Sequence, residues 1–164
     1  MWTDERGSEV LHPAECRRLL ALAAKQHRHG HVAGADGTVP FVLPVDYSMY
    51  DSDILIRVGQ GLFAGLVDRL VAFEVDGTVA RRGLQGMEDE SEWSVMAQGL
   101  ATEVQADTVA GHGPHPRVAE PGNRILRIRT DVLTGRRLAP PAGPTPPDDG
   151  TAGADRNRGR KLRT

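Results

Sequence analysis

The sequence has little cysteine, few aromatic residues and no long hydrophobic run. Its 164 residues include one cysteine, so an internal disulfide is excluded and a reducing, cytoplasmic location is expected. No stretch approaches the roughly 18 consecutive apolar residues of a membrane span, and the first residues lack the basic and then apolar pattern of a secretory signal. The net charge of −2 argues against a general nucleic-acid-binding protein. We therefore expect one globular domain with no membrane or nucleic-acid partner.

Proline and glycine are concentrated at the C-terminal end. Residues 139–164 hold five of the 11 prolines and four of the 19 glycines, with Leu162 as their only large apolar residue. Such a segment buries too little surface to offset the entropy of ordering, which predicts a disordered tail with a basic end. The tail is interpreted as a solvated terminus or as a weak electrostatic tether. A flexible leader over residues 1–10 and one domain over residues 11–138 are expected before it.

The spacing of apolar residues predicts two helices and six short strands. A proline at position 13 and apolar residues three and four apart predict a helix over 13–25. Alternation predicts strands over 31–35 and 39–47, joined by the Asp36-Gly37 turn of a hairpin. Further strands are expected over 54–58, 71–76, 93–104 and 124–132, with a second helix over 61–70 and a loop over 77–91. Gly99 is expected to be a bulge or a point of close approach, and the whole to be a small barrel.

A glycine-rich segment lies between an expected strand and the second expected helix. Gly59-Gln60-Gly61 has this position in dinucleotide-binding units. The 24 residues from Asp53 to Asp76 are too few for the parallel crossover of such a unit. The glycines still allow backbone amides to approach a phosphate without that sheet.

Several charged or aromatic side chains are candidates for ligand binding. Arg57, Arg127 and Arg129 lie within expected strands, where a guanidinium can hold a phosphate or carboxylate or pair with a neighbouring acid. Trp93 could fill the core or stack against a planar ring. No catalytic triad, pair of carboxylates or nucleophilic cysteine motif stands out. An enzyme built on this chain would therefore take its chemistry from a cofactor.

Histidine and cysteine offer weaker candidates. His27, His29 and His31 alternate and would share one side of an extended segment, either as a metal site or as solvated imidazoles at a junction. Cys16 lies on the apolar side of the first expected helix and is interpreted as a buried, inert thiol. No acid or cysteine at ligand spacing strengthens the metal hypothesis, so no metal is expected.

Four segments in this order resemble the pyridoxamine 5'-phosphate oxidase-like flavin-binding split-barrel proteins, most closely the actinobacterial flavin/deazaflavin oxidoreductase type. They are GHVAGADGTVPFVLPVDYSMYDSDILIRVGQG, DRLVAFEVD, WSVMAQGLATEV and RILRIRTDVLTGRRL, after a helix that contains Glu15-Cys16. The resemblance extends over about residues 11–138. It implies a six-stranded Greek-key split β-barrel with an N-terminal helix and one or two short helices, and a homodimer with flavin sites between the subunits.

The resemblance also implies cofactor-binding residues. They are Leu43, Pro44, Val45, Tyr47, Arg57, Gly61, Phe63, Trp93 and Ser94. The backbone of the first three would lie along the isoalloxazine ring, with the tyrosine following in the same strand. The arginine and the loop from position 59 to 63 would lie near the ribityl phosphate, and the last two residues would come from the other subunit.

The sequence departs from that family's pattern in the phosphate loop. The family has a glycine, a small hydroxyl residue and a lysine that reaches the phosphate, whereas this chain has Gly61-Leu62-Phe63. Loss of a charge-assisted phosphate contact costs about 1.5–3 kcal/mol, roughly tenfold to a hundredfold in affinity. Glu92 replaces the usual glycine before the tryptophan, and His31 stands where arginine is frequent.

Two functions remain open at this point. One is an oxidoreductase that acts on a small molecule with FMN or the deazaflavin coenzyme. The other is a non-catalytic split-barrel binding module that has lost FMN and holds haem, another ligand or none. The sequence identifies no catalytic residue for the first function.

Overall fold

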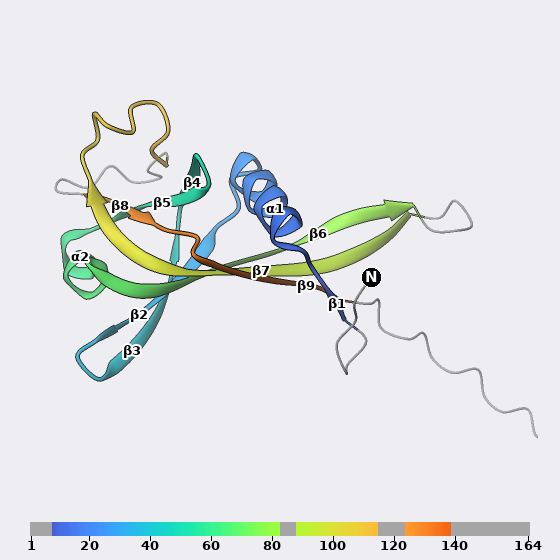
Figure 1. Ribbon diagram of the computed structural model, residues 1–164, viewed down its shortest axis with the longest axis horizontal. Helices are drawn as coiled ribbons and strands as arrows, with labels where there is room; N and C mark the ends of the chain where they lie inside the picture. The colour runs from blue at the N-terminus through green and yellow to red at the C-terminus, as the bar shows by residue number, and fades with distance from the viewer. Residues whose placement is uncertain (1–7, 83–87, 115–123, 139–164) are drawn as a thin grey trace, which may run out of the picture.

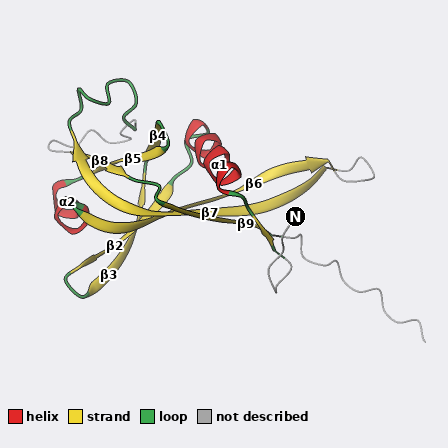
Figure 2. Cartoon of the chain, in the orientation of Figure 1, coloured by secondary structure: helices red, strands yellow, loops and turns green. Residues whose placement is uncertain are grey.

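The computed structural model describes residues 8–82, 88–114 and 124–138, which form two helices and nine strands (Figures 1 and 2). The elements are β1 (Glu9–Val10), α1 (Pro13–Lys25), β2 (Gly30–Asp36), β3 (Val39–Val45), β4 (Tyr47–Tyr50), β5 (Asp53–Val58), α2 (Gln60–Leu66), β6 (Arg69–Arg82), β7 (Glu88–Val104), β8 (Arg124–Ile128) and β9 (Val132–Arg137). The predicted mainly β architecture with an N-terminal helix is confirmed. The expected tail lies outside the described residues, as do the first seven residues of the expected leader. No helix in the described ranges is long and apolar enough to cross a membrane.

The elements with strong local signals lie where they were predicted. The first helix spans the expected residues, and its N-terminal amide at Ala14 is capped by the side chain of His12. The hairpin of β2 and β3 turns at Asp36-Gly37, where the glycine has a φ of 59° that favours glycine over other residues. Both signals act within a few residues, so no distant contact is needed to specify them.

Two of the expected strands are each divided in two. Asp46 separates β3 from β4, which pairs with β5 instead of β2. Residues 129–131 separate β8 from β9, which pair with different halves of β7. The alternation of apolar residues continues across each break, and alternation along one strand does not reveal a change of partner. These divisions, together with β1, explain why nine strands are found where six were predicted.

Three other predictions about local structure were wrong. The second helix ends at Leu66 and not at Leu70, because Asp68 adopts a positive φ of 56° and the chain enters β6 at Arg69. Most of the segment 77–91 forms the outer part of the β6–β7 hairpin and not a loop, because backbone pairing continues as far as Arg82 and Glu88. The end of the expected flexible leader forms β1, which pairs with β9.

The strands form one antiparallel sheet that curls into an open barrel (Figure 1). The order is β3-β2-β6-β7-β8-β5-β4, and β9 lies beside β7 and β1. The two end strands, β3 and β4, are consecutive in the chain and are joined by Asp46 alone. The curled sheet therefore brings its ends together without closing by strand pairing, as in a split barrel.

The inner face of the sheet is packed with apolar side chains beneath α1. Phe73 is fully buried at its centre and meets the ring of Tyr47 edge-on at 4.8 Å. The Tyr47 hydroxyl donates to the carbonyl of Leu20 in α1 at 2.9 Å, and burial raises the pKa of this phenol. The buried thiol of Cys16 lies in the same core, and desolvation raises its pKa, as expected for an inert cysteine.

Ion pairs join α1 to the end of β9. The Arg137 side chain is 12% exposed and donates to Glu9 at 2.8 Å and to Glu15 at 3.1 Å. Glu15 also accepts two hydrogen bonds from Arg18. The bonds from Arg18, with a smaller effect of Arg137, hold the pKa of Glu15 below its usual value.

We expect Glu15→Gln to lower the free energy of unfolding at pH 7 by about 0.5–1 kcal/mol, because folding favours the carboxylate form of Glu15. This stabilisation is present above the pKa of the unfolded carboxyl and is lost as the pH falls through the lower pKa of the folded protein. Urea unfolding at pH 7 and at about pH 3.5 would measure the difference between variant and wild type. A difference that does not shrink at the lower pH would contradict the prediction.

Candidate functional site

The end of β3 offers backbone groups to a ligand. Among the described strands β3 pairs only with β2, so every second residue has its N–H and C=O directed away from the sheet. Val45 is buried and Leu43 is half-buried on the inner face, while Pro44 is exposed on the outer face. Such an edge can hydrogen-bond a planar heterocycle through its backbone. The side chain of Tyr47, in contrast, is 5% exposed within the core.

Arg57 lies on β5, close to this edge, since β3 and β5 are in contact. It pairs in register with Ile125 of β8, and both side chains lie on the outer side of the barrel. Its Nε donates to the carbonyl of Pro114 at 3.3 Å, and within the described ranges no carboxylate pairs with it. A half-buried guanidinium with a carbonyl partner retains N–H donors and a full charge for an anion.

The other two candidate arginines have structural partners. Arg127 pairs with Asp53 at 2.6 Å and lies over the ring of Tyr50. Arg129 pairs with Asp131 at 2.9 Å. The structure therefore distinguishes Arg57 from the two other arginines that the sequence offered as candidates for ligand binding.

The loop after β5 leads into α2, and two amides of its first turn already have partners within the turn. The amides of Leu62 and Phe63 both donate to the carbonyl of Gly59 at 3.2 Å, while Gly61 is exposed with open space around it. Phe63 is half-buried, and the guanidinium of Arg124 lies 3.8 Å from the centre of its ring. Arg124 in turn makes a bidentate pair with Glu103, at 2.6 and 2.7 Å. A cation is thus present beside position 63, but it is already paired.

Trp93 and Ser94 lie on the outer part of the β6–β7 hairpin, away from the other candidates. Ten residues of β7 separate Trp93 from Glu103, which is about 30 Å along an extended strand. Trp93 is 2% exposed, and its indole Nε1 is buried with no acceptor among the described residues. It borders a cavity of about 230 Å³ that Ser94 also lines. One copy of the chain therefore does not bring these two residues to Arg57.

The three alternating histidines do not form a metal site. His29 pairs with Asp46 at 3.0 Å, and His31 pairs with Glu74 at 3.5 Å. His27 precedes them with a positive φ of 54°. Within residues 8–82, 88–114 and 124–138, no group of three potential ligands could hold a metal ion.

An exposed, largely apolar surface crosses five strands on the outside of the sheet. Its residues, Val42, Ala33, Ala72, Gln98 and Val132, pair in register across β3, β2, β6, β7 and β9, and Leu70 lies beside them. We call this set the outer face. Leu70 is 80% exposed, Val42 64% and Val132 49%, which is unusual for large apolar side chains on one face of a sheet.

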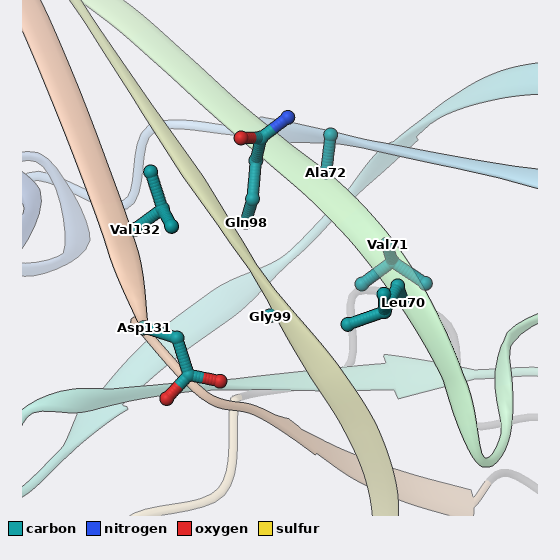
Figure 3. Close-up of a pocket in the computed structure, with 7 residues that line it drawn as sticks. All are labelled: Leu70, Val71, Ala72, Gln98, Gly99, Asp131 and Val132. Carbon is teal, nitrogen blue, oxygen red and sulfur yellow. The ribbon is translucent and has the colours of Figure 1, made fainter.

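The outer face also contains a cavity and borders the end of β3. Figure 3 shows Ala72, Gln98 and Val132 beside one another on three strands, around a cavity of about 400 Å³. The next row of paired residues includes Pro44, His31 and Glu74. Sequence reasoning missed this surface, because its members look like ordinary alternating residues until the register places them in one row.

Comparisons with solved structures show the same fold. The FAD-binding protein of Mycobacterium smegmatis superposes with a TM-score of 0.63 and is 22% identical, over 79% of this chain and 98% of that chain. An FAD-binding protein of Mesorhizobium loti gives 0.55 at 19% identity, over 80% and 99% of the two chains. The FAD- and haem-binding protein of M. smegmatis gives 0.53 at 15% identity, over 77% and 72%. These identities establish the fold alone.

The family assignment rests on the sequence. A search of curated proteins finds no match. The model of the pyridoxamine 5'-phosphate oxidase family matches residues 12–137, from the cap of α1 to the last residue of β9. With the split-barrel fold and its flavin-binding neighbours, this match shows that the chain belongs to the pyridoxamine 5'-phosphate oxidase family.

Proposed function

We propose that this chain binds a flavin, FMN in the first place, as a cytoplasmic homodimer and uses it to oxidise or reduce a small molecule. The observation that carries the proposal is Arg57, a half-buried guanidinium without a carboxylate partner among the described residues, near the open edge of β3. A flavin phosphate and its planar ring need these two features, a free charge and a row of backbone groups.

The second copy supplies what one chain does not place near Arg57. Trp93 lies ten residues before Glu103, about 30 Å along an extended β7, whereas the outer face reaches to within one row of paired residues of Pro44. A second copy seated on the outer face would cover its exposed apolar side chains and bring its own hairpin toward this edge. The indole N–H of Trp93 is buried without an acceptor among the described residues, so this side chain would have to turn toward the cavity that it borders in order to reach a flavin oxygen.

The chain's own residues would bind and orient the cofactor. A bound flavin supplies two-electron transfer, which no described side chain can perform. Arg57 would neutralise the phosphate, and the backbone of Leu43 and Val45 would fix the plane of the ring. FAD has the same isoalloxazine ring as FMN, and the deazaflavin coenzyme has a planar tricyclic ring of similar shape. Three of the similar structures are FAD-binding proteins, one of which also binds haem.

One observation favours the alternative of a binding module that has lost FMN. Phe63 occupies the place of the family's lysine, and the nearby Arg124 is neutralised by Glu103. In that case haem or another ligand, or none, would bind in place of FMN. Titration with flavins separates the two functions directly.

Titration of the purified protein with FMN, FAD, riboflavin and the deazaflavin coenzyme, followed by absorbance, tests the proposal. We expect Arg57→Gln to weaken FMN binding about tenfold to a hundredfold and to leave riboflavin binding unchanged, because riboflavin lacks the phosphate. Arg17→Gln removes an exposed guanidinium from α1 and is the matched control, expected to bind both like the wild type. Equal losses of FMN and riboflavin affinity in Arg57→Gln would contradict the phosphate-binding role of Arg57. A wild type that binds no flavin at all would overturn the proposed oxidoreductase function.

A further inference from the structure

Residues 105–114 follow β7 and run beside β8 and β4 (Figure 1), and their Val109 packs against residues of β5 and β8. We call this segment the crossing loop. Val109 anchors it, since it is 2% exposed and packs with Leu55 and Ile125 in a small cluster separate from the main core. The crossing loop is therefore seated on the sheet at the strand that carries Arg57.

Strand β4 holds the far part of the crossing loop. The Ser48 hydroxyl donates to the carbonyl of His112, and the ring of His112 meets Tyr50 edge-on at 5.2 Å. Gly111 provides the turn before it, with a φ of 79°. These contacts fix the backbone two residues before Pro114.

The crossing loop ends on the guanidinium of Arg57. Pro114 is buried, and its carbonyl accepts the Nε hydrogen of Arg57 at 3.3 Å. Gly113 lies beside the same side chain. A Cβ added at this glycine would be 3.6 Å from Nη2 of Arg57. An Nε bond fixes the plane of a guanidinium, whose Nη groups then point in one direction.

We propose that the crossing loop is a positioning element, which presents the Nη groups of Arg57 to the phosphate of the cofactor. This inference rests on the proposed flavin function. A long arginine side chain loses much rotational freedom when it binds an anion, and the carbonyl of Pro114 restricts that freedom beforehand. Ser48 acts through the His112 backbone, because its hydroxyl donates to that carbonyl while the Nε of Arg57 donates to the carbonyl of Pro114.

A double-mutant cycle between Ser48 and Arg57 tests the proposal. We expect Ser48→Ala to weaken FMN binding about threefold to tenfold and to leave riboflavin binding unchanged. In the Arg57→Gln background the same substitution should have no further effect on FMN, because the group that it positions is absent. Thr130→Ala removes another hydroxyl that donates to a backbone carbonyl, that of Ser52, and is the control expected to leave binding unchanged.

NMR exchange of the Arg57 Nε hydrogen gives a readout that needs no flavin. We expect this hydrogen to exchange slowly in the wild type and several times faster in Ser48→Ala. The proposal is overturned if Ser48→Ala weakens FMN binding equally with and without Arg57, or if it leaves the exchange of this hydrogen unchanged. A wild type that binds no flavin but shows the protected hydrogen would refute the proposed function and retain the positioning contact.

Discussion

Substitution of Gly99 by alanine is expected to lower the free energy of unfolding by about 3 kcal/mol or more. An added Cβ would lie 1.8 Å from the carbonyl oxygen and 2.7 Å from the carbonyl carbon of Arg129, well inside van der Waals contact. Both atoms belong to the backbone, so no change of rotamer relieves the clash. The expectation of a close approach at this glycine is confirmed by the structure.

The position of Gly99 explains why the chain cannot move away from an added methyl group. β7 pairs with β9 up to Gln98 and with β8 from Ala101, so its partner changes at this point. The amide of Arg129 donates to the carbonyl of Leu100 at 3.1 Å, which holds the connection between β8 and β9 against β7. Relief of the clash would separate these strands and open the barrel.

Gly61→Ala is the matched control for this prediction. No atom lies within 4 Å of the added Cβ, and the residue is helical in α2, so alanine should stabilise the fold by about 0.5–1 kcal/mol. Urea unfolding of both variants at pH 7 would measure the opposite effects. A Gly99→Ala variant within 1 kcal/mol of the wild type would show that the strands separate easily at this point.

The sequence was sufficient for elements that local chemistry specifies. The capped helix α1 and the Asp36-Gly37 hairpin depend on neighbouring residues alone, and both were predicted with the right positions. The division at Asp46 was missed, because the change of partner from β2 to β5 is a long-range event. The extension of the β6–β7 hairpin was missed for a related reason. The residues that extend it lack the alternation of apolar side chains that marks a strand, and they form strands through backbone pairing across the hairpin.

The candidate site shows the same limit. The sequence predicts all three arginines within strands and favours acid pairing for Arg127 and Arg129 more than for Arg57, and the structure identifies the carboxylate partners of those two. The hydrogen bond from Arg57 to Pro114 joins residues 57 positions apart. Its acceptor is a backbone carbonyl, which every residue carries, so no side-chain pattern could have indicated it. The family resemblance supplied the proposed phosphate role of Arg57, and the structure gives this guanidinium a carbonyl partner and no carboxylate among the described residues.

The proposed second copy on the outer face leads to the most demanding prediction about function. Ala72 lies in the middle of this face, with Ala33 and Gln98 as its partners in register. We expect Ala72→Glu to raise the dissociation constant of the dimer by more than about a hundredfold, because the new carboxylate would be buried against an apolar partner without a counter-ion. Sedimentation velocity over a range of protein concentrations would measure the change.

The same variant separates a dimer that completes the flavin site from one that does not. In the proposed dimer Trp93 of one copy lies beside Arg57 of the other, so loss of the dimer should weaken FMN and riboflavin binding together, unlike the phosphate-specific loss in Arg57→Gln. Ala14→Glu places the same carboxylate in the exposed first turn of α1, which packs on the inner face, and should preserve both dimer and binding. A wild type of monomer mass would refute the interface site, and a monomeric Ala72→Glu that still binds FMN would confine the cofactor to one chain. In that last case the edge of β3 and Arg57 would have to hold the flavin alone, and the buried indole of Trp93 would need another acceptor.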